Sequence, residues 1–244
     1  MTDPEQKLEL LRHGVLEIVG RIIESSNSAF LTKVSYHGET SNAIYKPEAT
    51  ERDLWDFEPG LWKREVAAYY VAIAIGSDFV PPTVARLDEE NLPAGIGSLQ
   101  LFIDGDFSQT YFSLRDSGLF NDQLFDVAIF DLIVNNADRK GGHFIVQGGK
   151  IYAIDHGLCF HENVKLRTVI WDFNNREISE QKRDEVRNFL WQLIDESSNL
   201  RKILSDLLSK SELNALIKRT RAVYSLDRFP DVPEDLRPYP WPVI

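Results

Sequence analysis

A helical pattern followed by two strand patterns begins the chain. Residues 8–23 carry apolar side chains three and four positions apart and predict a helix, which ends at the polar residues 25–28. Residues 29–36 and 41–46 are rich in strand formers and flank His-Gly-Glu-Thr at 37–40, a segment typical of a hairpin connection. We therefore expect one helix and then a β-hairpin.

A buried helix and two further strands follow the hairpin. Residues 61–75 combine small and aromatic side chains and predict a well-buried helix that ends at Gly76. Residues 80–87 and 98–103 have strand patterns, with a turn-rich connection between them. The predicted order is thus strand, strand, helix, strand, strand.

The rest of the chain is mainly helical and contains one short hairpin. Asn121 predicts the cap of an apolar helix that reaches residue 134. Two short apolar strands at 143–146 and 150–154 flank a glycine turn, and residues 180–224 show the spacing of two or three helices. The proline-rich end is expected to run extended over the surface or back onto the helices.

These patterns predict an α+β protein with two lobes. Residues 1–103 would form a small N-lobe with an antiparallel sheet and one main helix, and residues 104–244 a mainly helical C-lobe. The boundary is placed at 103/104 because the chain becomes polar and irregular over residues 104–117.

Charge and composition narrow the classes of partner. The formal net charge of -11 argues against a nucleic-acid partner and against stable membrane association, because both usually need clustered Lys and Arg. Residues 1–9 lack the features of a signal peptide, and no apolar run approaches the roughly 18 residues of a membrane span. Cys159 is the single cysteine, so an intramolecular disulfide and a multi-cysteine zinc site are excluded. We expect a cytoplasmic protein.

Lys46 and Glu65 are the first candidate functional pair. Lys46 ends a predicted strand, where a long ammonium side chain can reach phosphate oxygens, and Glu65 lies on the next helix among apolar residues. A glutamate there can hold the lysine through an ion pair. The simpler interpretation, that each is a solvated surface charge, stays open from the sequence.

Two aspartates and a histidine form the second candidate group. Asp138 lies in the polar turn after the apolar helix, and Asp155 follows the second short strand, with His143 between them. One carboxylate can act as a base and the other can hold a metal ion. Capping or turn formation is the alternative role of each aspartate.

A hydroxyl-rich turn precedes the first strand of the hairpin. Its residues can cradle a phosphate group through hydroxyl and backbone N–H groups, although neither a GxGxxG nor a P-loop motif is present: Ser25, Ser26, Asn27 and Ser28. A plain surface turn is the alternative interpretation.

The motifs taken together resemble a known family. Tyr-Lys-Pro at 45–47, Arg-Glu-Val-Ala-Ala-Tyr at 64–69, Asn-Ala-Asp-Arg-Lys-Gly-Gly-His at 136–143 and Ile-Asp-His-Gly at 154–157 are similar to motifs of phosphatidylinositol 3- and 4-kinase-like proteins. This branch of the protein kinase superfamily includes the HipA-type serine kinases and the secretory-pathway casein kinases. The resemblance runs from about residue 14 to near the end and also includes Val-Pro-Pro-Thr at 80–83 and a Trp-Asp-Phe loop at 55–57.

The resemblance implies a two-lobed kinase-like fold that binds ATP and a divalent metal. Lys46 would contact the ATP phosphates, Glu65 would be its helix partner, Asp138 the catalytic base and Asp155 the metal ligand. The hinge that reads the adenine edge would consist of four consecutive residues: Gln100, Leu101, Phe102 and Ile103.

His143 departs from the family pattern, which has asparagine as the second metal ligand. Imidazole suits Mn²⁺ better than Mg²⁺, so the metal would be either of the two. The first functional hypothesis is a kinase that acts on a hydroxyl of an unknown protein or small-molecule acceptor. The alternatives are a pseudokinase that uses nucleotide binding as a switch or scaffold, and transfer of AMP on the same fold.

Overall fold

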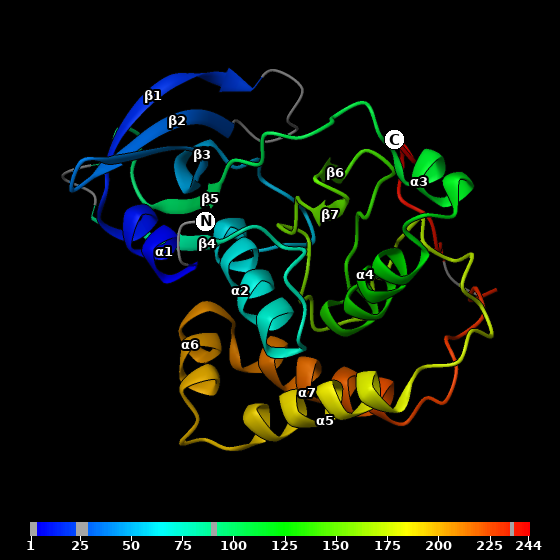
Figure 1. The fold of residues 1–244 in the computed structure, drawn as a ribbon. Coiled ribbons are helices and arrows are strands. Elements are labelled where there is room, and N and C mark those ends of the chain that lie inside the picture. The colour runs from blue at the N-terminus through cyan, green and yellow to red at the C-terminus, as the bar shows by residue number, and fades with distance from the viewer. Residues whose placement is uncertain (1–3, 23–28, 89–91, 235–236) are drawn as a thin grey trace.

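The two-lobed α+β architecture is confirmed in the computed structural model, which describes residues 4–22, 29–88, 92–234 and 237–244 (Figure 1). An antiparallel sheet and two helices form one lobe, and helices with one short hairpin form the other. The boundary at 103/104 stays a prediction, although the last strand of the large sheet ends at Leu101.

Five antiparallel strands form the sheet in the order β1-β2-β3-β5-β4. The hairpin expected at 29–46 is β2 and β3, and its turn places His37 and Gly38 at positive φ. The two later strands are also present, each shorter than expected. The bounds are β1 Val15–Ile22, β2 Ala29–Tyr36, β3 Glu39–Pro47, β4 Thr83–Arg86 and β5 Gly97–Leu101.

The single helix predicted at 8–23 is wrong. Helix α1 covers only Pro4–His13, and β1 begins two residues later. At Gly14, where the chain turns from helix to strand, an added Cβ would lie 2.4 Å from Val34 and 2.6 Å from the Leu10 carbonyl oxygen. The β-branched residues that follow favour a strand once the helix has ended.

Helix α2 (Leu61–Ala74) connects the two lobes and is firmly held at its N-terminus. The Glu51 carboxylate accepts hydrogen bonds from the backbone N–H groups of Gly60, Leu61 and Trp62 at 2.8 to 2.9 Å. These donors have no partner within the helix, so the carboxylate satisfies them and favours the positive end of the helix dipole. The expected stop at Gly76 is present with φ at 73°.

The C-lobe holds the remaining helices and a two-stranded hairpin. Helix α3 lies in a segment that we expected to be irregular, because Thr110 and Ser113 form a reciprocal capping box that polar composition alone did not suggest. Helix α4 begins at Asn121, but Phe120 is the capping residue, so the predicted asparagine cap is wrong. The bounds are α3 Tyr111–Ser117, α4 Asn121–Val134, β6 Phe144–Gln147, β7 Lys150–Ala153, α5 Glu180–Ile194, α6 Asn199–Leu207 and α7 Lys210–Tyr224.

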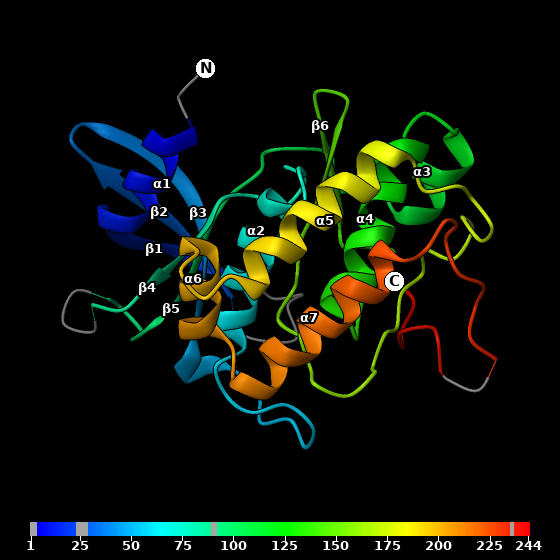
Figure 2. The same ribbon diagram turned by 90° about the horizontal axis from the view of Figure 1, so that it is seen from below.

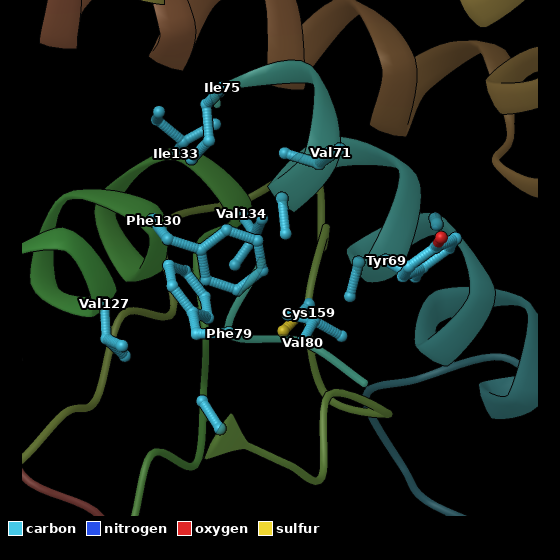
Figure 3. Packing of buried hydrophobic residues seen from close by; sticks show 14 of the residues in the cluster. Tyr69, Val71, Ile75, Phe79, Val80, Val127, Phe130, Ile133, Val134 and Cys159 are labelled. Atoms are coloured by element: carbon cyan, nitrogen blue, oxygen red, sulfur yellow. The ribbon is translucent and has the colours of Figure 1, made fainter. Parts of the chain in front are cut away.

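A continuous apolar core joins the lobes. Side chains of α2 and α4 meet around Phe79 and Phe130, whose rings are 5.3 Å apart, and the fully buried Cys159 belongs to the same cluster (Figure 3). From the other side, α6 packs on α2, and α5 and α7 pack together next to α4 (Figure 2). Helix α2 is therefore fixed between the sheet and the helical lobe.

The chain end packs back onto the C-lobe, which is one of the two alternatives expected from the sequence. The carbonyl of Pro238 accepts hydrogen bonds from the Thr168 backbone and the Trp171 indole, and that of Val243 accepts one from Gly141. No helix in the described ranges is long and apolar enough to cross a membrane.

Candidate active site

Lys46 lies where three elements meet. On β3, Ala43 and Tyr45 are buried while Ile44 and Lys46 are partly exposed, so the lysine projects from the opposite face of the strand. Its Nζ lies 2.5 Å from Glu65 Oε1 on α2 and 3.1 Å from Asp155 Oδ1, which follows β7. The predicted Lys46–Glu65 ion pair is thus present, and Asp155 belongs to the same cluster.

The charges of this cluster stabilise one another. Lys46 holds the pKa of Asp155 well below its usual range, against the opposing effect of burial. Burial alone would lower the pKa of Lys46, but the carboxylates of Asp155 and Glu65 outweigh it and raise that pKa. Glu65 is only 3% exposed and Asp155 is 45% exposed, so the second carboxylate faces solvent and can meet a ligand.

Asp155 has an unusual backbone conformation. Its φ is 62°, in the left-handed region that residues other than glycine rarely occupy. Aspartate tolerates this region better than most side chains. Conformational outliers of this kind concentrate at functional sites.

Asp138 lies in the turn after α4, on the other side of the hairpin β6–β7. Its backbone N–H donates to Asn136 Oδ1 at 3.0 Å, and its carboxylate pairs with Lys140 Nζ at 3.0 Å. Burial raises the pKa of Asp138, an effect that Lys140 opposes and the charge of Asp155 reinforces. Asp138 is therefore the more basic of the two carboxylates.

His143, the residue directly before β6, reaches the same cluster. Its Nε2 lies 3.6 Å from Asp155 Oδ2, and its Nδ1 accepts a long hydrogen bond of 3.4 Å from the Lys140 backbone N–H. Burial lowers the pKa of His143 to about 4. A histidine that binds metal through Nε2 usually donates a proton from Nδ1, so the Lys140 amide would have to turn away for that role.

The donors present fit a metal ion that is only partly held by protein. In the described part of the chain no group of three or more histidine, cysteine or carboxylate side chains is arranged to hold a metal. Asp155 supplies a solvent-facing carboxylate, and His143 is a further donor 3.6 Å from it. Mg²⁺ and Mn²⁺ fit such a site because substrate phosphates and water complete their coordination.

A buried polar network next to Asp138 and Asp155 supports their two loops. The sequence analysis did not predict it. Asp131 on α4 and Arg139 are both 0% exposed, and the guanidinium donates to both carboxylate oxygens at 3.1 to 3.3 Å. Arg139 also donates to the Ile154 carbonyl at 2.9 Å and to His156 at 2.8 Å. The turn that carries Asp138 is thereby tied to the loop that carries Asp155. The available signal was that Asp131 interrupts the otherwise apolar residues 127–134.

The predicted hinge forms the end of β5 and the segment after it. Leu101 and Phe102 donate their backbone N–H groups to the carbonyls of Pro82 and Asn42. The Gln100 side chain is buried and donates to Thr83, so it is held within the sheet. The predicted phosphate-binding residues lie outside the described part of the chain: Ser25, Ser26, Asn27 and Ser28.

Comparison with known families shows the family of this chain. The family model for phosphatidylinositol 3- and 4-kinases matches residues 12–181, most of both lobes. The chain belongs to this family. Within the phosphatidylinositol 3- and 4-kinase family, Protein Rv2133c of Mycobacterium tuberculosis is 33% identical, over 99% of this chain and 97% of that protein.

Solved kinase structures share the fold of this family member. The Golgi casein kinase with Mn/ADP bound has a TM-score of 0.58 at 16% identity, over 92% of this chain and 76% of that chain. Hydra Fam20 with sugar has 0.53 at 14%, over 88% and 85%, and the Helicobacter pylori proinflammatory kinase CtkA has 0.51 at 12%, over 88% and 93%. At these identities the likeness establishes the kinase-like fold.

Proposed function

We propose that this family member is an ATP- and metal-dependent kinase that transfers a phosphoryl group to a hydroxyl of a protein or small molecule. The observation that carries the proposal is the convergence of Lys46, Glu65 and Asp155 from three separate elements. Phosphoryl transfer needs fixed positive charge, metal held by carboxylate and a base at the acceptor, and little covalent chemistry from the protein.

Each residue of the cluster has a proposed role. Lys46 binds the ATP phosphates. Glu65, a buried residue of α2, keeps the ammonium group directed at them. Asp155, with His143 as second ligand, would hold Mg²⁺ or Mn²⁺, and the metal would supply positive charge for the phosphates. Asp138, whose pKa burial raises, accepts the proton of the acceptor hydroxyl.

Ile103 is the best-placed member of the proposed hinge. The neighbouring backbone N–H groups of Leu101 and Phe102 are already donated within the lobe. The Ile103 N–H has no hydrogen-bond partner among the described residues, so it is free to donate to a ring nitrogen of adenine. The Gln100 side chain would act only indirectly, through the strand that it supports.

Labelled ATP distinguishes the proposal from its two alternatives. The protein is incubated with ATP labelled at the α or the γ phosphate, with Mg²⁺ or Mn²⁺, and products and self-modification are scored. Release of ADP with transfer of the γ label supports the kinase, whereas transfer of the α label would replace it with AMP transfer. Tight binding without turnover would favour a nucleotide-binding switch, and absence of binding would refute all three.

Two matched variants connect the reaction to the site. We expect Asp155→Asn to abolish metal-dependent ATP binding. We expect Asp138→Asn to reduce turnover about a hundredfold or more while ATP still binds. The control is Asp206→Asn, the same change at an exposed position on α6. Equal turnover of all three variants would remove both aspartates from the proposed site.

A further inference from the structure

His156 lies between two charged side chains, those of Arg139 and Glu65. The residue is 0% exposed and directly follows the proposed metal ligand Asp155. Its Nε2 is 2.8 Å from Arg139 Nη2, and its Nδ1 is 4.0 Å from Glu65 Oε2. No described residue hydrogen-bonds to that Nδ1 atom.

The contact with Arg139 fixes the tautomer of the ring. A guanidinium group only donates hydrogen bonds, so His156 Nε2 must accept and carries no proton. An imidazole ring without a proton on Nε2 is neutral and carries its single proton on Nδ1. A donor thus faces the Glu65 carboxylate across 4.0 Å.

Glu65 is held from both sides by this arrangement. Its Oε1 pairs with Lys46, and its Oε2 accepts the His156 backbone N–H at 3.0 Å. A shift of roughly 1 Å would bring the orphaned Nδ1 proton to the same oxygen, within ordinary hydrogen-bond distance. An unpartnered buried donor is unusual in a native protein and calls for a reason.

We propose that His156 is a positioning residue for Glu65, and through Glu65 for Lys46, with its own ring oriented by the Asp131–Arg139 pair. The inference rests on the proposed function, since it concerns how the phosphate-binding lysine is set. His156 touches no reacting group itself. The buried pair of the C-lobe would in this way determine the position of a side chain on a strand of the N-lobe.

Packing offers a competing role for the same ring. The rings of Phe130 and His156 meet edge to face at 5.4 Å, so the histidine could serve only to fill space. Replacing His156 with phenylalanine keeps an aromatic ring of similar size and removes both polar atoms. Replacing it with glutamine keeps a terminal oxygen that can accept from Arg139 and an N–H that can donate.

The test is a double-mutant cycle. His156→Phe and Glu65→Gln are made singly and together, with His156→Gln as the rescue and Phe130→Leu as the packing control. We expect His156→Phe to lower kcat/KM about ten- to hundredfold, a size typical of a lost hydrogen bond to a charged group. In the Glu65→Gln background its further effect should be less than about threefold, and His156→Gln should regain most of the loss.

Additive losses, or equal losses in His156→Phe and His156→Gln, would overturn the proposal in favour of packing. Phe130→Leu should remain additive with Glu65→Gln in either case. The same cycle is run on chemical unfolding without nucleotide, where we expect a coupling of about fivefold or more in the unfolding constant. A parent protein that fails to use ATP would refute the proposed function, while the unfolding cycle would still decide the contact between His156 and Glu65.

Discussion

Replacing Asp131 with asparagine removes one charge of the completely buried ion pair and keeps the side-chain size. The carboxylate accepts from Arg139, and also from Asn136 Nδ2 at 3.0 Å and Thr168 Oγ1 at 3.1 Å. In the variant one oxygen stays available, one becomes an amide donor, and the Arg139 guanidinium keeps its full charge. We expect Asp131→Asn to destabilise the protein strongly.

The size of the effect follows from the burial. Both side chains are 0% exposed, so solvent cannot screen the charge that remains. Removing one partner of such a pair costs about 3–5 kcal/mol, a large part of the roughly 5–15 kcal/mol by which domains are stable. The oxygen that asparagine keeps favours the lower end, about 3 kcal/mol. With a urea dependence of about 2–3 kcal/mol per molar, the unfolding midpoint should fall by about 1 M.

Urea unfolding, followed by tryptophan fluorescence and circular dichroism, measures this shift. The matched control is Asp227→Asn, which removes the acidic partner of Arg183 from an exposed pair and should change the midpoint little. The double variant Asp131→Leu with Arg139→Met leaves no buried charge and should recover much of the lost stability. A midpoint for Asp131→Asn as high as that of the control would refute the buried-charge argument.

Three further measurements examine the site and its core. Lys46→Met should weaken ATP binding about tenfold or more, and Glu65→Gln less, because the ammonium group contacts the phosphates directly; equal affinity of both variants and the parent, by calorimetry, would exclude the pair. If His143 is a metal ligand, His143→Asn should retain Mg²⁺-supported turnover and reduce any preference for Mn²⁺; an unchanged ratio of the two rates would leave Asp155 alone. Burial raises the pKa of the Cys159 thiol well above 9.0, so alkylation at pH 8 should proceed only as fast as the protein opens; fast labelling of the native protein would contradict the packing.

Most elements were predictable from the local pattern, although the pairing of β3 with β5 joins strands that lie far apart in the sequence. The hairpin β2–β3 and helix α2 lie close to where apolar periodicity and turn residues put them. The error at residues 14–23 has a physical origin, since Val15, Ile18, Val19 and Ile22 also satisfy helical spacing. The close approach of Gly14 to Val34, which ends the helix, is a tertiary contact that periodicity cannot reveal.

The charged residues of the candidate site that lie in the sequence motifs were predictable. The buried ion pair beneath them was not. Lys46 and Asp155 stood out at the ends of apolar segments and Glu65 within one, and the structure brings the three together. Arg139 lies in a polar turn that reads as solvated, yet it is among the largest fully buried side chains. Its partner Asp131 comes eight residues earlier, on the helix, so only the folded turn shows why either is present.

The two aspartates of the site are held in different electrostatic environments, and this difference supports separate roles for them. Asp155 adjoins Lys46, which keeps it ionised far into the acid range, as a metal ligand should be. The Asp138 side chain is less exposed than that of Asp155, 26% against 45%, and its paired cation, Lys140, lies on its own turn. Because a carboxylate with a raised pKa takes up a proton more readily, Asp138 is the better base. If the roles were exchanged, Asp155 would be the base although Lys46 lowers its proton affinity, and Asp138 would be the metal ligand although burial favours its neutral form.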